Sequence, residues 1–185
     1  MTYYGAKDLA SSFRTVRKNT IVIAEEIGEP HYSFRPAPET RSVAEILAHI
    51  ALVTRMPLQL HKTERRTTLE GFDFMGFLMP LLAEEKKPRS KAEIIAMLRS
   101  EGDAFASWLD TVSDDFLGQS VSMPPGMQPP SKSRFEMILG AKEHEMHHRG
   151  QLMLIERMVG VVPHLTREMN ARIESMMAAS GKASA

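Results

Sequence analysis

The sequence predicts an all-α fold, an antiparallel four-helix bundle with a short extra helix between its second and third helices and a C-terminal helix. Three observations support this. Apolar residues recur at spacings of three and four along several long segments, as on one face of an α-helix. Three of those segments begin with Ser-x-x-Glu, the capping-box pattern of helix N-termini. No segment shows a convincing apolar–polar alternation, so no strand is expected.

The first helix is expected over about Lys7 to Ile27, where apolar residues repeat every three or four positions. Gly28 and Pro30 follow directly and predict its end. The next segment, Glu29 to Arg41, contains three prolines, which disfavour helix in the residue before each of them. We therefore expect it to be an extended connection.

Capping boxes predict where the other three bundle helices begin. In this motif the serine side chain accepts a hydrogen bond from a backbone N–H three residues on, and the glutamate reaches back to the serine N–H. Each motif precedes a periodic apolar run. Pro57 should kink or end the regular part of the second helix, and Gly160 is well placed just after the fourth. The motifs are Ser42–Glu45, Ser90–Glu93 and Ser133–Glu136, and the helices are expected over about Val43–Lys62, Lys91–Val112 and Arg134–Val159.

The connections between these helices differ in character. Thr63 to Arg89 is long and rich in phenylalanine and leucine, so a short helix packed on the bundle is expected there. Ser113 to Lys132 is rich in proline and glycine and should be irregular. Thr166 to Met177 predicts a last, shorter helix. The chain is therefore expected to form one domain over residues 1–178, with a frayed tail over 179–185.

Composition limits the function classes. The chain has 185 residues, of which 43% are hydrophobic, enough for one sizeable core and too many for global disorder. Lysine and arginine balance aspartate and glutamate, giving a net charge of zero, which disfavours nucleic-acid binding. There is no cysteine, which excludes disulfides, thiolate metal sites and cysteine nucleophiles. Any metal must be held by histidine, aspartate or glutamate.

Targeting signals are not evident. The N-terminal segment MTYYGAKDLASSFRT lacks the continuous apolar region of a signal peptide. No stretch was expected to provide the roughly 20 apolar residues of a membrane span. We therefore expect a cytoplasmic protein that does not bind a membrane.

Histidines occupy positions where a bundle helix should be apolar. His144 and His148 are four residues apart, so both lie on one helix face, a spacing that helical metal sites use. His147 is rotated toward the flank of the helix. The shared face is expected to point toward the core, together with Met137, Ala141, Gln151, Ile155 and Met158.

His49 offers a third imidazole from the second helix. It lies in line with Glu45, Ile46 and Val53, which should also face inward. His49, His144 and His148 would make a three-nitrogen site with positions left open, as in catalytic metal sites. The alternative at this point is that the three histidines are core side chains hydrogen-bonded to their neighbours, in a purely structural bundle without metal.

The chain resembles the DinB/YfiT-like metalloprotein superfamily over roughly Tyr3 to Met177. The last bundle helix of that family carries H-x-x-H-H-x-G-Q, present here from His144 to Gln151. Its second helix carries a histidine in an apolar run, here Leu47-Ala-His49-Ile50. Gly160, Pro163 and His164 also resemble the family's exit from the last bundle helix.

This resemblance implies a bacterial protein with a divalent transition metal, Zn²⁺, Ni²⁺ or Fe²⁺, held by His49, His144 and His148. His147 would then orient ligands or lie at the surface. Implied activities are thiol S-transfer from a low-molecular-weight thiol and metal-dependent hydrolysis of a small molecule, and the implied assembly is a homodimer. Gln151, Glu145 and Glu45 are candidates for orienting the ligands.

Two other functions remain open. His144-Glu-Met-His147-His148 matches H-E-x-x-H, the zinc protease motif, in which Glu145 would be the base. Glu168 or Glu174 would then be the third ligand, but such proteases need an edge strand and none is expected. The other function is non-catalytic, a bundle that binds a metal or a small ligand as a sensor or carrier.

Several further residues receive simpler interpretations. Arg35 and Arg55 could meet an anionic substrate, although most such arginines are ordinary surface residues. Charged residues from Glu84 to Lys91 are expected to be solvated. His31, His61 and His164 are assigned no role. The methionines at helical spacings are expected to fill the core: Met97, Met137, Met146, Met153 and Met158.

Overall fold

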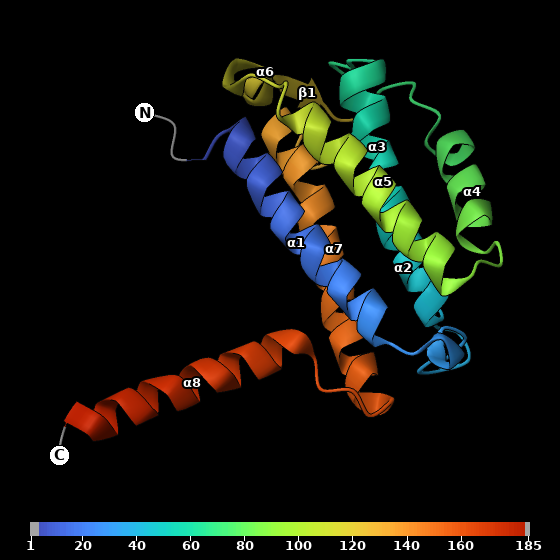
Figure 1. Ribbon diagram of the computed structural model, residues 1–185. Coiled ribbons are helices and arrows are strands. Elements are labelled where there is room, and N and C mark those ends of the chain that lie inside the picture. The colour runs from blue at the N-terminus through green and yellow to red at the C-terminus, as the bar shows by residue number, and fades with distance from the viewer. Residues whose placement is uncertain (1–3, 184–185) are drawn as a thin grey trace.

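Four long helices pack side by side in the computed structural model, which describes residues 4–183 (Figure 1). They are α1 (Ala6–Glu26), α2 (Val43–Val53) with its continuation, α5 (Lys91–Leu109) and α7 (Arg134–Met158). α5 and α7 each contact both α1 and α2, so α1 and α2 occupy opposite corners of the bundle. The predicted all-α bundle is confirmed.

The helix directions follow from the long connection after α2. In Figure 1, α1 and α7 run downward, whereas α2 and α5 run upward. α1 is thus antiparallel to α5, and α2 to α7, but the neighbours α2 and α5 are parallel, as are α1 and α7, so the bundle is not antiparallel throughout. Helix α4 (Phe74–Glu85) runs back along α2 and returns the chain to the lower end of the bundle. The short helix expected between Thr63 and Arg89 is therefore present and makes the parallel pair feasible.

Apolar stripes of the four helices form the core. The residues predicted to face inward on α1 are buried, among them Leu9, Phe13 and Ile23. One cluster, around Ile23, Leu47 and Leu152, fills the lower half of the bundle. A second, around Phe13 with Phe105 and Ile138, fills the upper half. The periodicity therefore identified the buried face of α1. On α7 it did so only in part, since Gln151 and Met158 of the expected inward face are exposed.

All three capping boxes form as predicted. The serine side chain accepts from the backbone N–H of its glutamate partner at 3.2–3.3 Å, and the serine N–H donates to that carboxylate at 2.7–2.8 Å. Gly160 has a φ of +85° just after α7, as a helix-ending glycine should. These local signals placed the three helix starts at the observed residues.

The second helix loses its regularity near Pro57, as expected. α2 ends at Val53, a short turn α3 (Arg55–Pro57) follows, and residues Leu58–Thr63 form a π-helical turn. Proline has no N–H to donate to the carbonyl four residues earlier, which disrupts the regular α-helical ladder at this point. The wider turn carries His61 into the bundle interior.

Two connections contain structure that the sequence did not predict. A 3₁₀ turn, Glu29–His31, interrupts the connection that was expected to be extended. The segment expected to be irregular contains α6 (Asp114–Gly118) and an antiparallel hairpin of β1 (Ser120–Ser122) and β2 (Ser131–Ser133). Strands of three residues are too short to show a period of two, which is why the expectation of no strand was wrong.

The C-terminal helix α8 (His164–Ala183) leaves the bundle and extends away from its lower end (Figure 1). It begins earlier than predicted and continues through most of the segment expected to fray, whose residues 184–185 lie outside the described part. Met146 and Met158 of α7 are 44% and 51% exposed, so the expectation that they fill the core was wrong. Both lie on the outward face of α7.

One segment, Val43–Thr63, is long and apolar enough for a membrane span by length and composition, with a hydropathy of 1.3. No such stretch was expected from the sequence. In the structure 56% of the segment's apolar window is buried, and α2 within it packs against α5 and α7. Core helices have this character, so the segment is weak evidence for a membrane span.

Candidate metal centre

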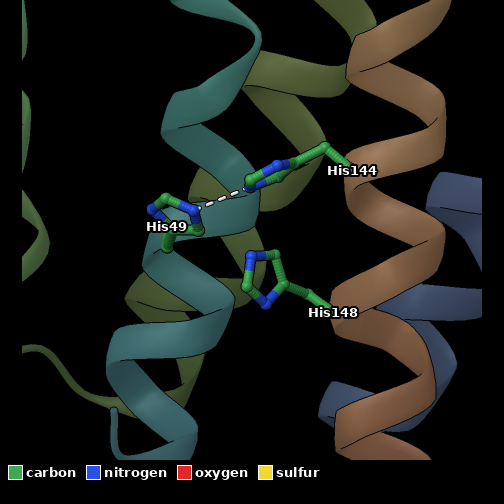
Figure 2. A group of neighbouring side chains, drawn as sticks. All are labelled: His49, His144 and His148. Carbon is green, nitrogen blue, oxygen red and sulfur yellow. Dashed lines mark hydrogen bonds between the residues drawn. The ribbon is translucent and has the colours of Figure 1, made fainter. Parts of the chain in front are cut away.

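Three imidazole rings converge between α2 and α7. His49 comes from α2, while His144 and His148 lie one turn apart on α7 (Figure 2). One nitrogen from each of the three residues lies within 4.8 Å of the others. The Nε2 atoms of His49 and His144 are 2.7 Å apart. The structure thus brings together the three histidines that helix geometry and the family resemblance selected, in an arrangement that can hold a metal.

The burial of the three rings is unequal. His148 is buried, whereas His49 and His144 are partly exposed, with 19% of the His49 side chain accessible. The sequence predicted that His49 faces the core. In the structure its side chain points there only in part. Its backbone neighbours Ala48 and Ile50 are buried, but its ring lies near the edge of the bundle.

A carboxylate from α4 fixes the orientation of His49. The Nδ1 atom of His49 lies 2.9 Å from Glu85 Oε2, and Arg41 donates to the same carboxylate. With Glu85 accepting the proton of Nδ1, the neutral ring leaves the lone pair of Nε2 for a metal. Glu85 is buried, so the expectation that the charged segment Glu84–Lys91 is solvated was wrong at this residue.

The side-chain amide of Gln151 fixes the orientation of His148. Its Oε1 atom lies 2.8 Å from His148 Nδ1, and its Nε2 atom lies 3.2 Å from the Nε2 of His147. A side-chain carbonyl that accepts from Nδ1 leaves Nε2 of His148 unprotonated. Gln151 therefore occupies the orienting position proposed for it, and His147 lies exposed at the surface.

The surroundings of His144 and His148 keep these two rings neutral. Burial, with the neighbouring His148 and His49, lowers the pKa of His144 to about 4. Burial also lowers the pKa of His148, opposed by its hydrogen bond to Gln151. Burial by itself raises the pKa of Glu85, but hydrogen bonds from His49 and Arg41 outweigh it and the pKa is lowered overall. The result is two neutral imidazoles and an ionised carboxylate near pH 7, the forms that bind and support a metal.

Glu145 does not contribute to this centre. It is fully buried and paired with Arg17 of α1, whose Nε lies 2.9 Å from its Oε1. It therefore faces α1, away from α2, and the predicted orienting role is not supported. Arg17 also donates to the carbonyls of Leu98 and Ile50, so this buried pair links all four bundle helices.

The zinc protease alternative loses its base for the same reason. Glu145 would have to face the histidines, and its carboxylate is committed to Arg17. Glu168 and Glu174 are exposed on α8, which leaves the bundle, so neither joins the three histidines. Residues 4–183 contain only the three-residue strands of the β1–β2 hairpin, too short to line up a peptide.

Glu45 lies one helical turn before His49, but its carboxylate accepts a hydrogen bond from the backbone N–H of Ser42. Its carboxylate caps α2 at Ser42 and pairs with Arg35 at 2.7 Å. The hydrogen bond from Arg35 lowers the pKa of Glu45, with further help from Ser42, against the effect of burial. Arg55, the other arginine considered for an anionic substrate, pairs with Glu101.

A cleft of about 1090 Å³ opens beside His148, the one member of the three that lines it. His148 and Gln151 line one side, and Glu85 and Arg41 line another. The remaining walls come from Arg35 to Ile46 and from the end of α4, with Leu82 and Lys86, as well as from Leu154 and Ile155 on α7. The cleft is large enough for a small-molecule ligand.

The profile of the DinB superfamily matches residues 12–152, more than half of the chain. The chain belongs to the DinB superfamily. Its metal motif residues, His49, His144 and His148, all lie within the matched segment.

Individual relatives within the DinB superfamily are distant. The uncharacterized protein YjoA of Bacillus subtilis is 21% identical over 155 residues, 84% of this chain and 91% of YjoA. Its DinB-like crystal structure aligns with a TM-score of 0.60 at 20% identity, covering 82% of this chain and 91% of YjoA.

Two further solved structures share the fold. YfiT of Bacillus subtilis, described as a probable metal-dependent hydrolase with an unusual four-helix bundle topology, aligns with a TM-score of 0.65 at 14% identity, covering 87% of this chain and 91% of YfiT. The colibactin self-resistance protein ClbS, solved with double-stranded DNA, aligns at 0.61 with 17% identity, covering 82% of this chain and 95% of ClbS.

Sequence reasoning missed Glu85 and Arg41, because neither lies in a recognisable motif and both reach His49 only through the packing of α4 on α2. It also missed Arg17, for which a signal existed. Arg17 follows Phe13 by four residues and precedes Thr20 by three, so it lies on the buried stripe of α1. A charged residue on such a stripe requires a buried partner.

Proposed function

We propose that the protein is a divalent-metal-dependent enzyme that acts on a small molecule, by hydrolysis or by transfer of a low-molecular-weight thiol. The observation that carries this proposal is the convergence of His49, His144 and His148 beside the cleft, with Glu85 behind His49. Three protein ligands leave positions open to the cleft, as in catalytic rather than closed structural sites. The description of the similar YfiT as a probable metal-dependent hydrolase supports hydrolysis.

The donor set fits Zn²⁺, Ni²⁺ or Fe²⁺, since imidazole suits all three and does not select among them. Bound there, such an ion would supply a Lewis acid that lowers the pKa of a water or thiol in the cleft. Glu85 and Gln151 hold His49 and His148 in the tautomer that presents Nε2. Lys86 lines the cleft without an ion-pair partner among residues 4–180 and would favour a substrate that carries negative charge, whereas Arg35 is paired with Glu45.

A non-catalytic bundle that binds a metal or small ligand is the second candidate. Glu45 and Glu85, two of the carboxylates that line the cleft, are each held by an arginine. Neither is therefore free to act as a general base. This favours binding without turnover if no other proton acceptor serves the cleft.

Partners and location remain proposals. The complex with DNA belongs to ClbS, and the zero net charge of this chain supports our prediction that it binds no nucleic acid. We also keep the prediction of a cytoplasmic protein with a small-molecule substrate.

Metal content of the untagged protein tests the centre. Wild type and His31→Ala, which alters an exposed histidine, should each carry about one equivalent of a transition metal by mass spectrometry, the stoichiometry of a single three-histidine site. His49→Ala should lose it. Retention in folded His49→Ala, or failure of the folded wild type to bind added Zn²⁺, Ni²⁺ or Fe²⁺, would contradict the proposal. Turnover of ester, amide or thiol-acceptor substrates that a chelator abolishes would then indicate an enzyme. Absence of such turnover would favour a non-catalytic carrier.

A further inference from the structure

A second cluster of polar side chains lies at the other end of the bundle from the histidines. It centres on Arg134, the first residue of α7, which is 1% exposed. Arg134 is 14 residues from His148 on the same helix, which places the two roughly 20 Å apart. The cluster is therefore separate from the candidate metal centre.

Arg134 has no carboxylate partner among the residues whose side chains the structure describes, 4–180. Its guanidinium donates to Gln119 Oε1 at 3.1 Å and to the backbone carbonyl of Arg65 at 3.3 Å, and it stacks on Phe116 at 4.4 Å. Burial, together with the charge of Arg65, lowers its pKa. A buried cation without a counter-ion makes this corner of the fold electropositive.

One N–H group of the His61 ring has no hydrogen-bond acceptor. Arg134 Nη1 lies 2.9 Å from His61 Nδ1. A guanidinium can only donate, so Nδ1 is the acceptor and the neutral ring carries its proton on Nε2. Burial and the charge of Arg134 lower the pKa of His61 to about 4, which keeps the ring neutral. Its Nε2–H is buried without a hydrogen-bond partner, an arrangement that calls for an acceptor.

A cavity of about 400 Å³ adjoins this cluster. His61, Lys62 and Arg65 line it on the side of the π-helical turn, and Trp108, Val112 and Phe116 give it an apolar wall. Within residues 4–180, neither Lys62 nor Arg65 forms an ion pair. Of the acids near the cavity residues in sequence, Glu64 is held by Arg66, and Asp114 accepts from the backbone N–H of Ala6.

The backbone is strained at this cavity. Arg65 has a φ of +51°, in the left-handed region that costs a residue with a side chain conformational energy. This conformation presents the Arg65 carbonyl to Arg134, while the Arg65 guanidinium lies 5.7 Å over the ring of Phe116. Strain of this kind concentrates at ligand sites, where surrounding contacts sustain it.

We propose that the cavity binds a small organic phosphate. The phosphate group would lie against Lys62 and Arg65, with the buried His61 and Arg134 behind them. Its apolar part would pack on Trp108, Val112 and Phe116. The N–H donors of a lysine and an arginine together suit the several oxygens of a phosphate better than the two of a carboxylate.

Trp108 makes the site directly measurable, because it is the single tryptophan of the chain and it lines the cavity. Phenyl phosphate and inorganic phosphate, added to the full-length protein, should change its fluorescence saturably. Lys62→Ala and Arg65→Gly should each weaken the binding of phenyl phosphate at least tenfold. Glycine is chosen at position 65 because it adopts a positive φ without strain. The matched control Lys18→Ala, an exposed lysine of α1, should bind like wild type.

His49→Ala should also bind phenyl phosphate like wild type, which separates this site from the metal centre. Loss of binding in His49→Ala would overturn the assignment, since the anion would then be ligated at the metal. No saturable change with either phosphate, or equal binding by folded Lys62→Ala and Arg65→Gly, would overturn it as well. Tighter binding of benzoate than of phenyl phosphate would overturn the choice of phosphate.

Discussion

The contact between His49 and Glu85 illustrates how a single buried carboxylate can orient a candidate metal ligand. Glu85 sits 36 residues from His49 in sequence and reaches it at 2.9 Å through the packing of α4 on α2. Carboxylates that accept from a ligand histidine fix its tautomer and raise its basicity. Glu85 therefore matters for the affinity of the centre even though it is not one of the three ligands.

Glu85→Gln should lower metal affinity about 10- to 100-fold, the usual cost of losing such a partner. The amide nitrogen can face His49 and favour the wrong tautomer, while the volume is unchanged. Competition with a chromogenic chelator measures the effect. Glu84→Gln, the adjacent residue with its own surface ion pairs, should leave the affinity unchanged. Equal affinities in both variants would refute this role for Glu85.

Glu156 of α7 predicts a dependence of stability on pH. It is fully buried, its carboxylate has no hydrogen-bond partner, and burial followed by the charge of Glu26 raises its pKa to about 7. The unfolded carboxyl ionises near 4.5. Between these values the unfolded chain binds fewer protons than the folded one, so this residue makes the free energy of unfolding fall as pH rises.

Glu156→Gln should remove that fall. The free energy of unfolding of the variant should exceed that of wild type by up to about 3 kcal/mol at pH 8 and by much less near pH 4.5. Each unit of pKa shift corresponds to about 1.4 kcal/mol. Urea denaturation at the two pH values measures the difference. A gain that is the same at both would show that the effect is packing and not ionisation.

Helix starts are the clearest lesson at the scale of the element. Ser42, Ser90 and Ser133 each close a capping box, and the helices begin at the next residue. The ligand histidines depend on two of these starts, because the register of α2 and of α7 decides which side chains face each other. α5 offers the cleanest test, since Ser90 is exposed and contacts neither proposed site.

Ser90→Ala should destabilise the protein by about 1 kcal/mol, because the N–H of Glu93 loses its side-chain acceptor. Ser100→Ala is the matched control within the same helix, where serine only donates to the preceding turn at Met97. It should be neutral or slightly stabilising, since alanine is the better helix former. Thermal unfolding of the two variants decides, and equal losses would argue against the cap.

At the scale of the whole molecule, α8 stands apart from the bundle beyond its first turn, where Arg167 pairs with Glu26. α8 extends from the bundle with an apolar stripe of exposed Met169, Ile173, Met176 and Met177, and isolated helices of this length are marginal in water (Figure 1). Two arginines and two glutamates balance the charge between His164 and Ser180. A second copy of the chain has the same stripe, and the zero net charge of this helix would not repel it. The two stripes can therefore pack against each other across a two-fold axis.

We therefore expect a homodimer held through α8, as the family resemblance implied. Size-exclusion chromatography with light scattering at micromolar concentration should give twice the chain mass. Ile173→Glu should shift it to the monomer, because a charge would be buried in the interface. Ala171→Glu, on the opposite face of the same helix, should remain dimeric. A monomeric wild type would contradict this assembly.

The sequence by itself determined what depends on neighbours within about four residues. Capping boxes, the end of α7 at Gly160 and the pairing of His144 with His148 on one face all follow from helix geometry. The inward-facing line of the second helix also selected His49, and the family motif agreed. These features could be predicted because each one is stabilised within its own turn of helix.

Only the tertiary structure decided the rest. Glu85 behind His49, Glu145 turned toward Arg17, the parallel run of α2 and α5 and the departure of α8 all depend on contacts between distant segments. Arg17 and Glu145 are 128 residues apart, and nothing near either one in the sequence names its partner. Such contacts form only where packing brings two faces together, so a local pattern can indicate a buried charge but not what neutralises it.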